Sequence, residues 1–246
     1  MAERLPRFFV SQPLTVGQTV VLDDTVSRHA GQVLRLRPGE NLILFDGSGG
    51  EYRGCVTGVK PRLAAAVEEF FDVDRESPLF TRLVQGVSRG ERMDYTLQKA
   101  VELGVSEIVP VFTRRTVVRL DATKEKKRLE RWCQIVRSAC EQSGRTAVPP
   151  VRPPQQLTQW LATPGKGARL LLDPYANRPL LGADVGAEAT LLIGPEGGLD
   201  NAERELAVAQ GFTGARLGPR VLRTETAAVA ALAILQATAG DAGAPV

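Results

Sequence analysis

Histidine, cysteine and aromatic residues are scarce in this 246-residue sequence, and each shortage excludes a class of site. His29 is the only histidine, and Cys55, Cys133 and Cys140 form no CxxC pair. A zinc site would be short of ligands, so we expect no metal. An odd, sparse cysteine count favours a reducing compartment without a disulfide framework. Aromatic residues make up 5% of the chain, which argues against a surface that stacks single-stranded bases.

Long apolar runs and a strong net charge are missing too. No stretch is long enough for a signal peptide or a membrane span, so we expect a soluble, cytoplasmic protein. The formal net charge of +3 permits an anionic partner such as nucleic acid without requiring one. Hydrophobic residues make up 43% of the chain, enough for one large or two modest domains.

The common nucleotide-binding and hydrolase motifs are also absent. The sequence has no GxxxxGKS or GxxxxGKT, so a P-loop is excluded. GPEGG (Gly194–Gly198) does not fit GxGxxG, which disfavours a dinucleotide-binding Rossmann site, and there is no GxSxG elbow. A ligand at these glycines would instead be recognised mainly by backbone N–H and C=O groups.

Short runs of apolar or alternating residues characterise residues 1–72. Turn signals such as Arg37-Pro38-Gly39 separate them, which predicts a small β-barrel interrupted by one helical turn at about 27–36. The expected strands are 8–10, 19–22, 41–45, 52–59 and 64–70. A small barrel with a basic rim is a common way to hold RNA by its backbone and shape, although solvated surface arginines are the alternative.

Strand–helix units follow a charged, proline-containing linker at 73–78. Strands are expected at 79–84, 108–112, 169–172, 190–193 and 215–217, and helices at 93–103, 123–143, 157–161 and from about 224. This alternation predicts a mainly parallel sheet with helices on both faces in a second domain, 79–246. In the helix 123–143, capped by Asp121 or Thr123, Trp132, Val136 and Cys140 mark a buried stripe. The apolar final helix must be covered by the sheet or by a second subunit, and we expect a dimer contact at Leu232.

Two glycine-rich turns mark the segment 191–226. Gly194–Gly198 follows one apolar strand, and Gly218-Pro219 follows the next. Each turn leaves the carboxyl end of a strand, where open α/β sheets bind ligands, and glycine lets a ligand approach the backbone closely. We therefore predict a single pocket with two walls.

These turns also carry a family resemblance. IGPEGGL (Ile193–Leu199) followed by LGPRVLRTETA (Leu217–Ala227) closely resembles the RsmE family of ribosomal RNA uridine N3-methyltransferases, in the SPOUT superfamily. Further blocks match in order over nearly the whole chain: PRFF from Pro6, HAGQVLRLRPGE from His29, LFDGSG from Leu44, SRGERM from Ser88, KAVELGV from Lys99 and ACEQSGR from Ala139. GPEGG alone would be weak evidence, whereas all blocks in this order are specific. LLLDPYAN (170–177) matches least.

The resemblance implies a trefoil-knotted, Rossmann-like α/β methyltransferase domain behind an N-terminal PUA-like β-barrel, in a homodimer. The substrate would be N3 of one uridine in the 16S rRNA of the small ribosomal subunit. The methyl donor would be S-adenosylmethionine and the product S-adenosylhomocysteine. Nothing in the residues themselves predicts the knot. A non-catalytic RNA- or ribosome-binding protein with the same fold is the alternative, but it would have no need of two backbone-exposing turns.

The candidate site residues form three groups. By the family pattern, the donor-binding residues would be Leu172, Ile193, Gly194, Pro195, Glu196, Gly197, Gly198, Leu199, Leu217, Gly218, Leu222, Arg223 and Thr224. The catalytic candidates, chosen because they are charged and close to the two turns, are Arg223, Glu196 and Glu225. The arginines assigned to RNA are Arg7, Arg28, Arg35, Arg89, Arg92, Arg145 and Arg220.

Simpler roles remain open for some of these residues. Glu225 could only complement a helix dipole, and Thr224 could be a helix N-cap. Arg223, beside a glycine-proline turn, is harder to explain by structure alone. Loss of the uracil N3 proton could be assisted by a base or by a cation that stabilises the anionic ring, and the sequence identifies no general base.

Overall fold

The computed structural model describes residues 5–117 and 122–243, and the chain divides into two compact units. The first runs up to Glu76 and also includes Cys140–Val148; the second comprises Ser77–Ala139 and the residues from Pro149 onwards. No local sequence signal indicates that the segment Cys140–Val148 belongs with the first unit, because its membership depends on long-range contacts. Among the described residues, no helix is long and apolar enough to cross a membrane.

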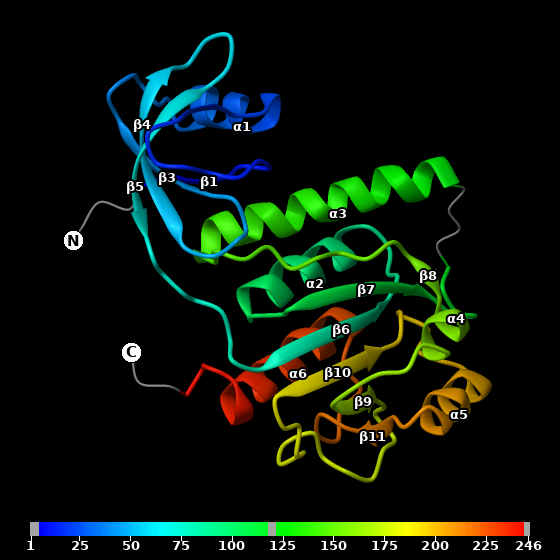
Figure 1. The fold of residues 1–246 in the computed structure, drawn as a ribbon. Helices are drawn as coiled ribbons and strands as arrows, with labels where there is room; N and C mark the ends of the chain where they lie inside the picture. Colours follow the sequence, from blue (N-terminus) through cyan, green and yellow to red (C-terminus); the bar gives the residue numbers. More distant parts are fainter. Residues whose placement is uncertain (1–4, 118–121, 244–246) are drawn as a thin grey trace. The chain divides into compact units, whose positions relative to one another are not determined.

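Five short strands form the sheet of the first unit (Figure 1). They are β1 (Arg7–Phe9), β2 (Thr19–Val21), β3 (Asn41–Phe45), β4 (Glu51–Gly58) and β5 (Ala64–Phe71), in the order β1-β3-β4-β5-β2. β1 runs parallel to β3, and the other neighbours are antiparallel. Alternate residues such as Phe8, Leu42 and Leu44 face one buried core. The small β domain with a helical interruption, α1 (Asp24–Arg28) and a π-helical turn (His29–Val33), is therefore confirmed.

Six strands form the sheet of the second unit, which is parallel as the alternation predicted and contains one short strand, β8 (Gln155–Gln156), that was not predicted. They are β6 (Phe80–Gly86), β7 (Glu107–Phe112), β8, β9 (Ala168–Leu172), β10 (Glu188–Ile193) and β11 (Thr213–Ala215), in the order β11-β9-β10-β6-β7-β8. Every neighbouring pair is parallel. β11 ends two residues before the predicted strand end at 217. The trefoil knot stays a prediction, since strand order describes neighbours and not how the chain is threaded.

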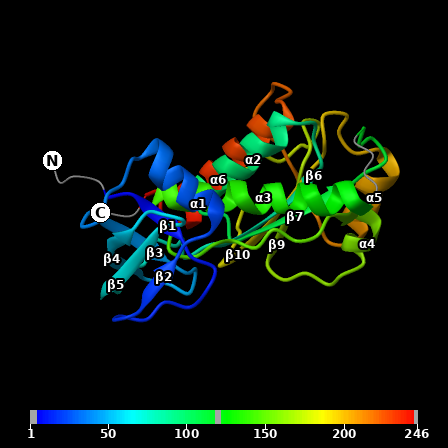
Figure 2. The same cartoon turned by 90° about the horizontal axis from the view of Figure 1, so that it is seen from above.

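Helices connect and flank these strands, and Figure 2 labels them. They are α2 (Glu91–Glu102), α3 (Ala122–Ser143), α4 (Leu157–Leu161), α5 (Asn201–Ala209) and α6 (Thr224–Ala239). α4 and α5 share an apolar core with Val84 and Leu192 of the sheet, whereas α6 packs against α2 and β10. In α3, Trp132, Val136 and Cys140 are buried, which confirms the predicted stripe. The suggested cap Asp121 lies outside the described residues.

The apolar final helix is covered by its own chain. Leu232 of α6 is completely buried, together with Ala228 and Leu235 on the same helix. These side chains recur at three- and four-residue steps, so they form the stripe that packs into the core. The expectation of a dimer contact at Leu232 is therefore wrong.

Candidate functional site

A cavity lies at the carboxyl ends of β9, β10 and β11, where the two glycine-rich loops meet. Its lining includes every predicted donor-binding residue except Gly218, which belongs to the second loop, and the three catalytic candidates Arg223, Glu196 and Glu225. Parallel strands present their carboxyl ends at one edge, and this places loops that are distant in sequence around one space. The chain thus brings together the two walls that the sequence predicted.

Close backbone packing holds the first loop, Gly194–Gly198, against the neighbouring strand. A Cβ built on Gly86, at the end of β6, would lie 2.4 Å from the nitrogen of Pro195, and one on Gly194 would lie 2.9 Å from the carbonyl carbon of Gly198. Gly198 has a φ of +69° and donates its N–H to the carbonyl oxygen of Pro195, 2.8 Å away. A side chain at Gly86 or Gly194 would force the loop apart.

Thr224 connects this loop to the start of α6. Its hydroxyl donates to the carbonyl oxygen of Gly194 at 2.7 Å and accepts from Nε2 of Gln85 at 2.9 Å. Gln85, on β6, is completely buried. The N-cap position belongs to Arg223, whose side chain makes no capping bond, so the alternative role of Thr224 as an N-cap is wrong. Thr224 instead fixes the loop, the strand and the helix relative to one another.

Arg92 lies between Glu196 and Glu225, two of the carboxylates that line the cavity. Its Nη1 is 3.2 Å from an oxygen of Glu196, and its Nε is 3.9 Å from an oxygen of Glu225. Glu196 also accepts the backbone N–H of Arg89 at 3.0 Å. Burial alone would raise the pKa of Glu196, but the backbone hydrogen bonds and Arg92 outweigh it, so this pKa is lowered. A carboxylate with a lowered pKa is a weaker base, which favours an anchoring role for Glu196.

The rim of the cavity is cationic. Its lining arginines are Arg92, Arg115, Arg204, Arg216, Arg220 and Arg223, against the carboxylates Asp173, Glu196 and Glu225. Arg216, Arg220 and Arg223 are exposed, and in the described part of the chain none of the three forms an ion pair. Unpaired cations at a concave surface attract polyanions such as RNA. Of the arginines assigned to RNA, Arg92 and Arg220 thus lie at this rim.

Arg115 and Asp173 line the cavity although the sequence analysis did not select them. Nη1 of Arg115 donates to the carbonyl oxygen of Gly197 at 3.0 Å, and Asp173 pairs with Arg204 at 3.2 Å. Both residues follow the end of a predicted parallel strand, β7 or β9. Asp173 comes directly after β9 and Arg115 three residues after β7, so polar residues shortly after buried parallel strands were the signal that could have found them.

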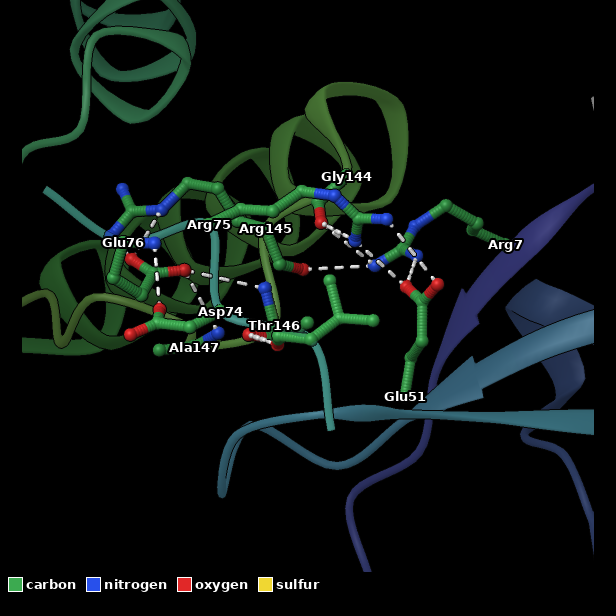
Figure 3. Close-up of polar contacts among 10 residues, drawn as sticks. Arg7, Glu51, Asp74, Arg75, Glu76, Gly144, Arg145, Thr146 and Ala147 are labelled. Atoms are coloured by element: carbon green, nitrogen blue, oxygen red, sulfur yellow. Dashed lines mark hydrogen bonds and ion pairs between the residues drawn. The ribbon is translucent and has the colours of Figure 1, made fainter. Parts of the chain in front are cut away.

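Two of the arginines assigned to RNA belong to an internal network in the first unit (Figure 3). Arg7 pairs with Glu51 and donates to the carbonyl oxygen of Arg145 at 3.0 Å, and its side chain is 8% exposed. The Arg145 side chain, 7% exposed, pairs with Glu76. Guanidinium groups that are buried and ion-paired are not available to a phosphate, so we infer that Arg7 and Arg145 stabilise the fold.

The remaining arginines assigned to RNA are exposed. Arg28 and Arg35 lie in the first unit, on and just after its helical segment, and Arg89 precedes α2 in the second. Their predicted contact with RNA stays a prediction. In the described ranges, no group of three or more histidine, cysteine or acidic side chains could hold a metal ion.

The comparisons with known proteins agree with this geometry. A family model described as an RNA methyltransferase domain matches residues 75–236, and one described as an RNA methyltransferase PUA domain matches residues 22–69. The chain is 30% identical over 245 residues to the ribosomal RNA small subunit methyltransferase E of Buchnera aphidicola, covering 98% of this chain and 99% of that one.

Two solved structures are similar over nearly the full length. One is a ribosomal RNA small subunit methyltransferase E from Neisseria gonorrhoeae bound to S-adenosylmethionine, with 42% identity, a TM-score of 0.89, and coverage of 97% of this chain and 100% of that one. The other is a putative methyltransferase from Legionella pneumophila in complex with the same cofactor, with 38% identity, a TM-score of 0.91 and the same coverage. Motifs, fold and full-length similarity lead to one conclusion: this chain belongs to the ribosomal RNA small subunit methyltransferase E (RsmE) family.

Proposed function

We propose that this protein transfers the methyl group of S-adenosylmethionine to N3 of a uridine in the 16S rRNA of the small ribosomal subunit. The observation that carries this proposal is the cavity at the carboxyl ends of β9, β10 and β11, with its glycine loops and cationic rim. The names of the relatives support the substrate class, and the family resemblance supports the uridine N3 position.

The residues of the cavity fit the proposed donor. The backbone of the two loops offers N–H and C=O groups, and Leu172, Ile193 and Leu217 offer an apolar lining. At Gly218 the φ is +79° and a Cβ would meet nothing within 4 Å, so the second loop leaves room beside its backbone. S-adenosylmethionine would supply an electrophilic methyl group on its sulfonium.

The chain's own contribution is positioning and charge. Methyl transfer is an in-line displacement, so holding the uracil N3 in line supplies much of the acceleration. In this proposal the exposed cations Arg220 and Arg223, which line the cavity, bind the RNA backbone or stabilise a uracil ring that has lost its N3 proton. Glu196, with its lowered pKa, holds Arg92 and the backbone of Arg89 rather than serving as the base.

The same proposal includes a homodimer that works in the cytoplasm, where small subunits are found. Tyr175 and Val221 support a partner chain beside the cavity, because they line it and are 77% and 73% exposed. Sedimentation of the Val221→Asp variant tests this assembly. A wild type that sediments as a monomer would overturn the homodimer.

The decisive experiment is methyl transfer from labelled S-adenosylmethionine to unmodified small ribosomal subunits, followed by mass spectrometry of the digested nucleosides. A 3-methyluridine peak would establish donor, substrate class and position together. Donor binding without transfer to either subunits or naked rRNA would favour the non-catalytic binding protein. No donor binding at all would overturn the proposal.

A further inference from the structure

A row of charged and polar side chains crosses the second sheet where apolar residues are expected. Arg169, Thr190, Arg82 and Glu107 are register partners on four neighbouring strands, β9, β10, β6 and β7. The next row on the same face, two residues further along each strand, consists of Leu171, Leu192, Val84 and Val109, all in the apolar core shared with α4 and α5. Parallel sheets are covered on both faces and read as apolar, so this polar row needs an explanation.

The polar row lines a second cavity, near the amino ends of the strands and away from the donor cavity at their carboxyl ends. Arg152, Trp160 and the loop Thr163–Lys166 also line it. Four cationic side chains, Arg82, Arg152, Lys166 and Arg169, face this space against two carboxylates, Glu107 and Glu188. The lining therefore has a formal charge of +2.

The two carboxylates are already neutralised. Glu107 is held between Arg82 and Arg152, each at 2.5 Å, and Glu188 pairs with Arg82 at 3.2 Å. Burial alone would raise the pKa of Glu107, but the hydrogen bonds from Arg152 and Arg82 outweigh it and lower this pKa. No carboxylate of the lining is left for Lys166 or Arg169, and neither has an ion pair in the part of the chain that the structure describes.

Arg169 is the residue that most needs a partner. Its Nη1 donates to the carbonyl oxygen of Gln210 at 2.7 Å, but Nε and Nη2 are buried with no hydrogen-bond partner among the described residues. The guanidinium lies over the rings of Phe212 and Trp160, at 4.5 and 5.7 Å from the centroids. Burial lowers the pKa of Arg169, and the charge of Arg82 lowers it further. Buried donors without acceptors are costly, and so is an uncompensated charge.

We propose that this cavity is an anion site that binds a phosphate group, with Arg169 and Lys166 as its principal ligands. A guanidinium presents a planar fork of donors that matches phosphate oxygens, and an ammonium adds a mobile point charge. Gly165, next to Lys166, lies so close to Arg169 that a Cβ there would be 3.1 Å from Cζ of the guanidinium, which brings the Lys166 loop to Arg169. The phosphate belongs either to an RNA backbone or to a small free phosphate compound.

Isothermal calorimetry of the full chain with inorganic pyrophosphate, at low ionic strength and with saturating S-adenosylmethionine, tests the site. We expect saturable binding that Lys166→Gln weakens about tenfold. Lys166 is exposed, so this variant keeps the fold. Arg169→Gln should abolish binding, and Lys126→Gln, which removes another exposed lysine, from α3, is the matched control.

A competition experiment between pyrophosphate and RNA identifies the source of the phosphate. A short single-stranded RNA that displaces pyrophosphate from wild type identifies a backbone phosphate, and failure to displace it identifies a small phosphate compound. No saturable heat from either probe, or equal affinities in Lys166→Gln and Lys126→Gln, would overturn the proposal. Because the donor cavity lies at the other end of the strands, Lys166→Gln should leave S-adenosylmethionine affinity unchanged, and that separates this site from the proposed function.

Discussion

The hydroxyl of Thr224 donates a hydrogen bond to the carbonyl oxygen of Gly194, 2.7 Å away and 30 residues earlier in the chain. The hydroxyl oxygen of Thr224 in turn accepts a hydrogen bond from the buried side-chain amide of Gln85, 2.9 Å away. The strand β6, the first glycine loop and the helix α6 are therefore connected through one side chain.

Thr224→Val removes this hydroxyl at nearly constant volume. The carbonyl of Gly194 and the amide of Gln85 each lose a partner, so we expect a loss of about 1–3 kcal/mol in the free energy of unfolding. Affinity for S-adenosylmethionine should fall as well, because the loop that lines the cavity loses its tether. Urea unfolding and calorimetry measure the two effects. Thr224→Ser keeps the hydroxyl, and a serine variant as weak as the valine variant would contradict this role.

Gly197→Val should weaken donor binding through Arg115. A Cβ on Gly197 would lie 3.1 Å from the Cβ of Arg115, so a branched side chain displaces the residues after β7 and the loop carbonyl that Arg115 binds. Overpacking of this kind lowers the free energy of unfolding by about 1–3 kcal/mol. The control is Gly58→Val in the first unit, where a Cβ would meet nothing within 4 Å. Calorimetric donor affinity equal in the two variants would show that the loop tolerates the displacement.

Arg7→Met should destabilise the first unit rather than act on RNA directly. The substitution breaks the buried ion pair between Arg7 and Glu51, but Arg75 still pairs with Glu51 at 2.9 Å. We therefore expect the free energy of unfolding to fall by about 2–3 kcal/mol, less than the usual loss when a buried ion pair is broken. Chemical unfolding measures the loss. Arg28→Met, at an exposed position, should leave stability unchanged. A fully stable Arg7→Met protein with a reduced salt dependence of RNA binding would show that Arg7 contacts RNA after all.

Glu51 should make the stability of the first unit sensitive to acid. Burial alone would raise the pKa of Glu51, but Arg75 and Arg7 outweigh it, so the folded-state pKa lies below the ordinary value of 4.5. The contribution of this carboxylate is therefore complete above about pH 4.5 and is lost as the pH falls through the lower, folded-state value. In Glu51→Gln this part of the pH dependence should disappear. Unfolding curves measured from neutral to acidic pH test it, and parallel profiles for the two proteins would contradict it.

Leu232→Glu should unfold the second unit whatever the oligomeric state. The side chain is completely buried in the stripe of α6, and a carboxylate there has no partner, so we expect a loss of more than about 3 kcal/mol. Ala237→Glu, on an exposed position of the same helix, is the control. If thermal melting shows that the Leu232→Glu protein is folded and sedimentation shows that it is monomeric, Leu232 lies at a subunit interface.

The sequence by itself predicted the two kinds of domain, the parallel sheet and a ligand cavity between two glycine-rich turns. These follow from local signals: hydrophobic periodicity marks strands and helices, and glycine turns after apolar strands mark a ligand-binding edge. Twelve of the thirteen predicted donor-binding residues line one cavity because neighbouring parallel strands all end at that edge.

Only the tertiary structure decided how individual charges are used. Arg7 and Arg145 look like any other basic residue of the sequence, yet Glu51 and Glu76, more than 40 residues away, bury and neutralise them. The row from Arg169 to Glu107 exists because strands distant in sequence are register neighbours. Whether an arginine is free to bind RNA or another anion, or instead stabilises the fold, depends on its long-range partners. Periodicity and local motifs contain no information about those partners.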